Sequence, residues 1–346
     1  MSGFKKIIRW SLLLFLLGLL AGSGIGYWLF FKANVDTHGS NAEYLYVPTG
    51  TDFEGLVTIL SDKKQLASAQ SFRWAAQIKK FTKVKPGRYR LFAGMNNNFL
   101  INKLRAGIQE PVVVNLNAIH TKEQLAGRLG RRLELDSNVV MAWLNNAENF
   151  KKWGFSSRNI MAMFMPQSYE LLWTISLPEL MEKLHADYSG YWTDERRAKA
   201  KEIGLTPVEV ITLASIVECE QSRFDDEKPT IAGLYLNRLH DGIPLQSDPT
   251  LVYATGNFAV NRVLKADKQV SSPYNTYKIS GLPPGPIILP EKSSVEAVLH
   301  YLPNDYYYMC AKEDLSGRHH FSTNLDQHNR FAKKYREALD KHNIRR

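Results

Sequence analysis

The chain has 346 residues, of which 44% are apolar and 23% charged, and its formal net charge is +10. This length allows two domains of ordinary size, and the composition is that of a globular protein rather than a disordered one. A basic chain suits an anionic partner, but no helix–turn–helix, zinc-finger or RNA-recognition pattern accompanies the charge, so nucleic acid is not an expected partner.

The N-terminal segment has the pattern of a membrane anchor. Residues 10–31 carry no charge and follow three basic residues. As a helix they span about 33 Å, enough for a hydrocarbon core of about 30 Å. Because basic flanks stay inside, we expect residues 1–9 in the cytoplasm and residues 32–43 as a polar spacer outside the membrane. A cleaved signal peptide, cut near residues 21–24, is the alternative, but the apolar run is longer than a typical signal core.

Six short elements follow the spacer in the order strand, helix, helix, strand, helix, strand. Apolar residues recur at helical spacing in the helices and alternate in the strands. The elements cover residues 44–47, 51–63, 68–81, 85–91, 97–106 and 112–116. This pattern predicts a compact α/β module, and the next stretch, residues 121–205, is predicted to be mostly helical.

The strongest local signal for chemistry lies at the end of a predicted helix. Residues 206–209, Thr-Pro-Val-Glu, have the pattern of a capped helix start. Glu218 lies one turn beyond Ala214, beside the apolar face of this helix, and partial desolvation there favours the protonated form that a general acid needs. Glu220 lies about 200° further around the helix and cannot share that face. A solvated charge is the alternative interpretation of a glutamate near a helix end.

Polar, turn-rich segments follow this helix. Residues 241–250, DGIPLQSDPT, and residues 274–277, YNTY, carry amide, hydroxyl and phenol side chains on irregular backbone, where binding residues concentrate. The Pro/Gly-rich run at residues 281–287 can form the wall of a cleft or can be a stiff connection. These segments therefore predict a polar binding site, such as one for sugars.

In their order and spacing, these segments resemble the signature of the endolytic murein transglycosylase family (MltG, YceG-like). The matching segments are Ser215-Ile216-Val217-Glu218, Asn237-Arg238, Leu245–Thr250, Tyr274–Tyr277, Gly281–Ile287, Phe321–Leu325 and His328-Asn329. The resemblance runs from about Tyr44 to the mid-330s. It implies an α+β protein with an N-terminal transmembrane helix, a small LysM-like α/β module over residues 44–117 and a mixed α+β catalytic domain over residues 118–340.

The resemblance also implies an activity. A member of this family is a single-pass protein of the cell (inner) membrane, with its catalytic domain outside the cytoplasm. It is a lyase that cleaves the MurNAc–GlcNAc bond within nascent peptidoglycan strands and leaves 1,6-anhydro-MurNAc ends. Its partners are then glycan strands and the membrane, with peptidoglycan synthases as further candidates.

The same resemblance assigns the site residues. Glu218 is expected as the general acid that then acts as a base. The candidate substrate-binding residues are Gln246, Asp248, Thr250, Asn237, Tyr274, Asn275, Tyr277 and Glu220. Two departures from the family pattern stand out, because Cys219 replaces a common basic residue and Gln167 replaces a common aspartate. No metal or other cofactor is expected, since the nine histidines show no HExxH pattern.

Three alternatives remain open. A hydrolase would use Asp248 as the partner of Glu218, because ordinary glycosidases need two carboxylates. A non-catalytic scaffold would bind the wall without cleaving it. The two cysteines, Cys219 and Cys310, could pair in an oxidising compartment, although a small buried Cys219 is the favoured interpretation.

Overall fold

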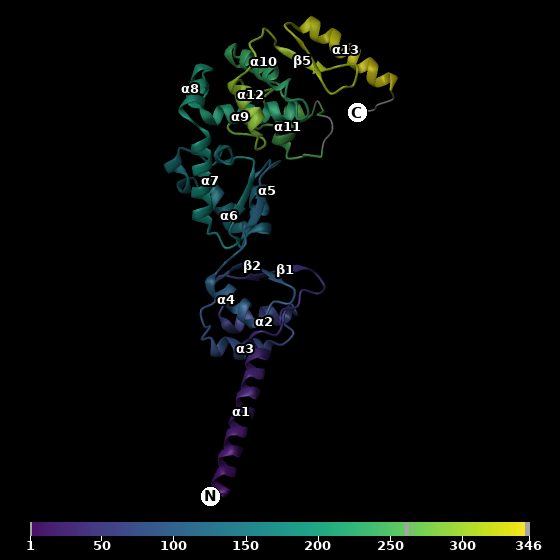
Figure 1. The fold of residues 1–346 in the computed structure, drawn as a ribbon. Helices are drawn as coiled ribbons and strands as arrows, with labels where there is room; N and C mark the ends of the chain where they lie inside the picture. Colours follow the sequence, from purple (N-terminus) through teal and green to yellow (C-terminus); the bar gives the residue numbers. More distant parts are fainter. Residues whose placement is uncertain (1, 260–262, 265, 343–346) are drawn as a thin grey trace. The chain divides into compact units, whose positions relative to one another are not determined.

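The computed structural model describes residues 2–259, 263–264 and 266–342. These residues form two compact units, each with its own helices and small sheets (Figure 1). The first unit comprises the described residues up to Val112 together with Arg132–Glu134 and Glu170–Ile175, and the second comprises the rest. Helices and two-stranded sheets occur together, which confirms the predicted α+β class.

The first unit begins with the long helix α1 (Ser2–Phe30). Among the described residues it is the one helix that is long and apolar enough to cross a membrane. Its apolar side chains are exposed almost to its end, where Leu29 becomes buried. So large an apolar surface favours an apolar surrounding over water, as expected for a membrane anchor. The orientation of the anchor remains a prediction.

The segment after α1, expected as a polar spacer, is hydrogen-bonded to the first unit. The backbone amides of Asn34 and Val35 both donate to the carbonyl of Met95, at 3.1 and 2.9 Å. Val35 also bridges to Leu66, and the side chain of Asn34 is buried. Because its backbone is paired, this segment holds the end of α1 against the unit.

The remainder of the first unit is a two-stranded sheet covered by three helices. Strands β1 (Ala42–Val47) and β2 (Gly87–Phe92) pair antiparallel. The helices α2 (Phe53–Asp62), α3 (Ala69–Ile78) and α4 (Asn97–Ala106) each begin with a side-chain cap. The observed elements confirm the predicted order of the first five strands and helices, because caps and periodicity are local signals. The sixth element, the strand expected at residues 112–116, does not join the β1–β2 sheet. The LysM-like assignment remains a prediction.

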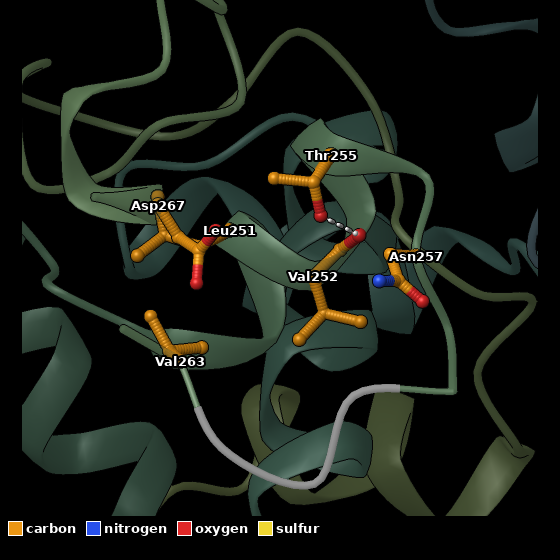
Figure 2. A pocket seen from close by; sticks show the side chains of 6 residues that line it. All are labelled: Leu251, Val252, Thr255, Asn257, Val263 and Asp267. Carbon is orange, nitrogen blue, oxygen red and sulfur yellow. Dashed lines mark hydrogen bonds between the residues drawn. The ribbon is translucent and has the colours of Figure 1, made fainter. Parts of the chain in front are cut away.

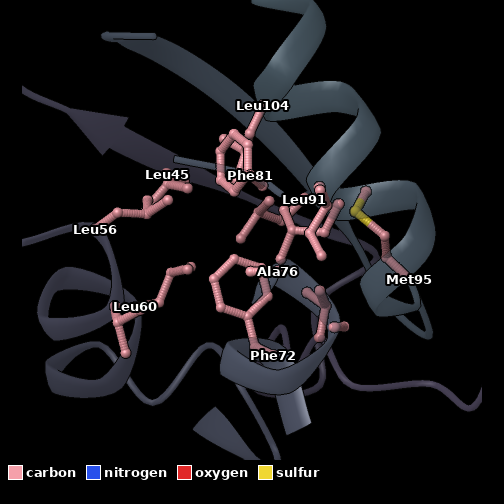
Figure 3. Close-up of a cluster of buried hydrophobic side chains, with 14 of the residues drawn as sticks. Leu45, Leu56, Leu60, Phe72, Ala76, Phe81, Leu91, Met95 and Leu104 are labelled. Atoms are coloured by element: carbon pink, nitrogen blue, oxygen red, sulfur yellow. The ribbon is translucent and has the colours of Figure 1, made fainter. Parts of the chain in front are cut away.

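Side chains from all these elements meet in one apolar core (Figure 3). Leu45 and Leu91 from the strands pack with Leu56, Phe72 and Leu104 from the helices, and none of these five is exposed. Burying such side chains contributes about 1.5–3 kcal/mol each. This core is what makes the first unit compact.

The second unit is mostly helical around a single buried helix. Its elements before that helix are β3 (Val112–Asn115), α5 (Lys122–Arg132), α6 (Ser137–Asn145), the 3-10 turns Ala147–Asn149, Lys151–Trp153 and Ile160–Met163, β4 (Ser168–Leu171), α7 (Leu177–Tyr191) and α8 (Asp194–Glu202). Strand β3 pairs with β4. The predicted helical character of this stretch is confirmed, apart from β4.

The buried helix is α9 (Pro207–Glu220), which α8, α10 (Lys228–His240), α11 (Asp248–Thr255) and α12 (Lys292–Leu299) contact. Every residue from Val210 to Val217 is buried. A helix buried on all sides is central to its domain. Burial was expected on one apolar face of α9, but it extends all the way round the helix and includes the polar residues Thr212 and Ser215.

A hairpin and a long helix complete the second unit. Strands β5 (Tyr308–Ala311) and β6 (His319–Ser322) pair antiparallel, with Cys310 opposite His320. Helix α13 (Leu325–Lys341) lies against both strands (Figure 1). The hairpin and α13 add side chains to the site described next.

Candidate active site

Helix α9 ends with two glutamates that face different surroundings. Its start is fixed by the predicted capping box: the Thr206 hydroxyl accepts from the Glu209 amide at 3.3 Å, and the Glu209 carboxylate accepts from the Thr206 amide at 2.8 Å. From there the helix runs to its last turn, which carries Glu218 and Glu220. Because residues two apart point in nearly opposite directions, the two carboxyls cannot serve one site together.

Glu218 lies in an ion pair between helices. Its Oε2 accepts hydrogen bonds from Lys228 Nζ, at 3.1 Å, and from the Ser294 hydroxyl. Lys228 is only 1% exposed and also pairs with Asp225 at 2.7 Å. Although burial opposes its charge, hydrogen bonds to Asp225 and Glu218 raise the pKa of Lys228. Glu218 therefore joins α9 to α10 and α12 through these two contacts.

A cavity of about 430 Å³ opens on the other side of the last turn of α9. This volume lies within the range of ligand sites. The lining residues are Glu220, Leu234, Tyr235, Arg238, Leu245, Gln246, Asp248, Lys268, Tyr277, Tyr307, Tyr308, Met309, Cys310, Ala311, His319 and His328. The lining is rich in charged, amide and phenol groups, as a sugar-binding site requires.

Glu220 is the carboxyl of α9 that lines this cavity. Its Oε1 accepts hydrogen bonds from the Tyr235 hydroxyl at 2.7 Å and from the Ser247 hydroxyl at 2.6 Å. No described residue donates to its second oxygen. Burial raises the pKa of Glu220 above its ordinary value, and the negative charge of Asp248 raises it further. The hydrogen bonds from Ser247 and Tyr235 and the positive charge of His319 lower this pKa, but they do not cancel the effect of burial. A raised pKa is what a general acid needs near neutral pH.

Arg238 holds the loop that faces Glu220. Its guanidinium donates to the carbonyls of Pro244 and Tyr307 and, at 2.8 Å, to Oε1 of Gln246. Gln246 has a backbone φ of 55°, a left-handed conformation that a side chain makes costly. Its amide nitrogen donates to the carbonyl of Thr276 at 3.0 Å. Strain of this kind is stored at functional sites when the surroundings enforce it.

Asp248 and Tyr277 form a second polar pair in the cavity. The Tyr277 hydroxyl donates to Oδ1 of Asp248 at 2.6 Å. Lys268 Nζ lies 4.1 Å from the centre of the Tyr277 ring, which is a cation–π contact. Burial and the Asp248 carboxylate both raise the pKa of Tyr277. The phenol is therefore fixed as a donor to Asp248.

The cavity thus brings together four of the predicted substrate contacts, Glu220, Gln246, Asp248 and Tyr277. The predicted catalytic residue, Glu218, is not among the lining residues, so its role remains a prediction that its ion pair disfavours. Glu218 and Glu220 point to different sides of α9, and the cavity lies on the side that carries Glu220.

The other four predicted contacts lie outside the lining, and their binding roles remain predictions. Asn237 donates to the carbonyls of Asn304 and Tyr306, at 2.8 and 3.0 Å. Asn275 donates to the carbonyls of Lys268 and Val270. Buried Thr250 bonds to Ser247 and Thr276, and the Tyr274 ring packs on Tyr253. These contacts tie down the loops that frame the cavity.

Several lining residues were not predicted as site residues. Arg238 and His328 fall within the segments that carry the family resemblance, and that signal could have identified them. Tyr235, Lys268, Tyr308 and His319 carried no local signal. Their positions depend on how α10, the 3-10 turn Asp267–Gln269 and the hairpin pack, which periodicity does not reveal.

The Pro/Gly-rich run packs against α9. The amide of Ile287 donates to the Ser215 hydroxyl at 3.0 Å. A side chain at Gly285 would lie 2.5 Å from the carbonyl oxygen of Arg158. Close approach of two backbones therefore requires glycine there.

Cys219 and Cys310 are both free, and burial raises the pKa of Cys219 to about 12. A second, smaller cavity of about 50 Å³ lies beside α11 and is lined by Leu251, Val252, Thr255, Asn257, Val263 and Asp267 (Figure 2). It is far below the roughly 300 Å³ at which ligand pockets begin. Of these two cavities of the second unit, the larger one is therefore the candidate active site.

Comparison with known proteins assigns the chain to a family. The model of the YceG-like family matches residues 45–334, which include most of both units and every residue of the larger cavity. The chain belongs to the YceG-like family. The resemblance inferred from the sequence segments is thereby confirmed.

Curated relatives of this YceG-like chain carry one name. This chain is 28% identical over 334 residues to the endolytic murein transglycosylase of Bacillus subtilis, and the match covers 92% of this chain and 91% of that protein. It is 27% identical over 358 residues to the protein of the same name from Streptococcus pneumoniae, covering 92% of this chain but only 63% of that protein. The chain therefore spans less than two thirds of the pneumococcal relative.

A solved structure supports the fold of the YceG-like chain. A crystal structure of a yceG-like protein from Listeria monocytogenes matches with a TM-score of 0.57 and 27% sequence identity. The match covers 84% of this chain and 98% of the other. Sequence and structure therefore indicate the same family.

Proposed function

We propose that this YceG-like chain is a membrane-anchored endolytic lytic transglycosylase, a lyase that cleaves the MurNAc–GlcNAc bond of nascent peptidoglycan strands. The names of its relatives support the substrate class and the type of reaction. The observation that carries the proposal within this chain is Glu220, a carboxyl with a raised pKa in a polar cavity of about 430 Å³. We assign the acid–base role to Glu220 instead of Glu218.

In this mechanism one carboxyl performs both proton transfers. Protonated Glu220 donates its proton to the glycosidic oxygen, the bond from that oxygen to C1 of MurNAc breaks, and an oxocarbenium-like state develops on MurNAc. The resulting carboxylate then takes the proton of the sugar's own C6 hydroxyl as its oxygen bonds to C1. The products are a 1,6-anhydro-MurNAc end and a free GlcNAc hydroxyl, and no water is consumed. The hydroxyls of Tyr235 and Ser247 hold the carboxyl in place.

The neighbouring groups are assigned supporting roles. Asp248, oriented by Tyr277, stabilises the positive charge that develops on the sugar through its own negative charge. Gln246 presents its backbone and side chain to the strand from a loop that Arg238 fixes. Thr250, Asn237, Tyr274 and Asn275 act through these loops.

The proposal includes a location. With the basic flank of α1 in the cytoplasm, the second unit and the part of the first unit that follows α1 lie outside the membrane, where nascent strands are made. Peptidoglycan synthases are then the proposed partners, since they release the substrate at that surface. The LysM-like module would position the catalytic domain above the membrane.

A two-carboxylate hydrolase is the second candidate, and one observation favours it: Asp248 lines the same cavity as Glu220 and raises its pKa. In that reaction the second carboxylate activates water or attacks C1. The two candidates differ in their products, because hydrolysis leaves reducing ends.

The deciding experiment is mass spectrometry of the products that the full chain forms from nascent, un-crosslinked glycan strands. We expect anhydro-MurNAc ends from the wild type and from Glu218→Gln, and no turnover from folded Glu220→Gln. Reducing ends would establish the hydrolase. Loss of activity in Glu218→Gln alone, with its fold intact, would return the catalytic role to Glu218. If neither the wild type nor either variant cleaves the strands, the chain is better described as a non-catalytic scaffold that binds the wall.

A further inference from the structure

The first unit carries three large apolar side chains in solvent on neighbouring helices. Trp74 and Ile78 lie one turn apart on α3 and are 48% and 62% exposed, and Phe99 near the start of α4 is 53% exposed. Residues four apart on a helix share a face. We call these three side chains the α3–α4 apolar face. Exposed apolar patches of this kind mark binding surfaces.

This face lies where α1 joins the unit. The rings of Trp28 and Trp74 are 6.5 Å apart, and α1 contacts both α3 and α4. The Asn97 side chain, two residues before Phe99, donates to the carbonyl of Leu29 at 2.9 Å. In Figure 1, α1 reaches the unit at α3, while the β1–β2 sheet lies on the other side. The apolar face is therefore continuous with the apolar surface of α1.

The geometry of α1 gives the depth of the face. The uncharged stretch ends at Phe31, three residues beyond Trp28, a rise of about 4.5 Å along a helix. If this stretch spans the hydrocarbon core, Trp28 lies at its outer edge, where tryptophan is favoured. Trp74, in contact with Trp28, lies at the same depth. A group at that level meets lipid headgroups rather than bulk water.

The join between α1 and the unit is stiff. Leu29 is buried in the core of the unit, and Asn97 is held by Leu29 and by the Ser71 hydroxyl at 3.1 Å. Asn34 donates to Asn97 Oδ1 at 2.7 Å. A helix fixed in this way cannot turn freely against the unit, so inserting α1 sets which face meets the bilayer.

We propose that the α3–α4 apolar face is a membrane-interfacial surface that lies in the headgroup region around α1 and fixes the orientation of the first unit on the bilayer. Amphipathic helices bury an apolar face about 5–10 Å into this boundary. Exposed Lys80 lies two residues beyond Ile78 and suits contact with lipid phosphates. The proposal rests on α1 as the membrane anchor and not on the assignment of Glu220.

The test measures the depth of spin labels on the full chain in vesicles of phosphatidylethanolamine and phosphatidylglycerol. Labels are placed by Ile78→Cys and Phe99→Cys, with Cys219 and Cys310 replaced by serine. Thr49→Cys, beyond β1, is the solvent control, and Leu17→Cys is the control inside α1. Access to oxygen, which concentrates in lipid, is compared with access to a water-soluble nickel chelate.

We expect the oxygen-to-nickel ratio at residues 78 and 99 to be several-fold above that at residue 49 and below that at residue 17. Equal ratios at residues 78, 99 and 49 would overturn the proposal. Labels shielded from both reagents would also overturn it, because they would indicate a protein on this face. A label at residue 17 that reaches the nickel chelate would overturn the anchor and the surface together, whatever the turnover of glycan strands.

A second measurement needs no label. Brominated phospholipids quench tryptophan fluorescence at short range. Trp74→Phe should remove more of the quenched signal than Trp173→Phe, because Trp173 packs on Tyr46 of the sheet. An equal loss in the two variants would contradict the proposed surface.

Discussion

Glu218 and Glu220, two residues apart at the end of α9, make different sets of contacts. Glu218 pairs at 3.1 Å with a lysine that is 1% exposed, whereas Glu220 accepts from the hydroxyls of Tyr235 and Ser247 at the edge of a cavity. Glu218 is held by a buried lysine, whereas burial raises the pKa of Glu220 above its ordinary value. The surroundings of Glu220 therefore suit proton transfer.

Activity should depend on the protonation of Glu220. Because burial raises the pKa of this carboxyl, we expect kcat/KM to fall as pH rises through that raised value. The Tyr235 hydroxyl donates to the carboxylate and lowers its pKa, so Tyr235→Phe should move the alkaline limb to higher pH. Tyr307→Phe is the control, since Tyr307 lines the same cavity but donates to Asp241. If the alkaline limb of the pH profile stays at the same pH in Tyr235→Phe, Glu220 is not the titrating acid.

The two glutamates should have opposite effects on stability. The folded state binds the proton of Glu220 more tightly than the unfolded state, so its contribution to stability is lost as pH rises above the ordinary glutamate pKa of about 4.3. Glu220→Gln should therefore be at least as stable as the wild type at neutral pH. Glu218→Gln should lose about 1–3 kcal/mol, because it weakens the ion pair of buried Lys228. Urea denaturation at neutral pH measures both, and equal losses would contradict the assignment.

Substitutions at Gln246 should reveal the free-energy cost of the left-handed backbone at this position. Both Gln246→Gly and Gln246→Val remove the amide that accepts from Arg238, so both should lower activity. At a φ of 55°, however, the β-branched side chain should cost roughly 1–2 kcal/mol more in folding free energy than glycine. Thermal unfolding of the two variants isolates this backbone effect. Equal stability would indicate that the loop relaxes.

Substitution by alanine should change the stability of the second unit in opposite directions at two helical glycines. A Cβ at Gly233 of α10 would lie 2.4 Å from the carbonyl oxygen of Leu302, so Gly233→Ala should destabilise by about 1–3 kcal/mol. A Cβ at Gly190 of α7 meets nothing within 4 Å, and Gly190→Ala should stabilise by up to about 1 kcal/mol. Denaturant midpoints distinguish these outcomes. A harmless Gly233→Ala would mean that the segment beside α10 moves.

Much of the fold was predictable because its signals are local. The helix at residues 97–106 occurs as predicted, with Asn96 as its cap. The capping box of Thr206 and Glu209 forms as expected, since it involves residues within one turn. The apolar run of α1 needed only composition and length. Local hydrogen bonds and periodicity depend on neighbours in the chain, which the sequence shows directly.

Only the tertiary structure decided which carboxyl of α9 faces the cavity. Thr206 and the apolar residues that follow it determined a helix that ends with Glu218 and Glu220. The residues that surround the end of this helix come from α10, the loop at Gln246, the β5–β6 hairpin and α13. These segments lie up to about a hundred residues away and meet through packing, which selects one face of a helix buried on every side. A helix buried on every side carries no sign in its own sequence of which side will be open, so only the positions of Lys228 and Tyr235 distinguished the surroundings of Glu218 from those of Glu220.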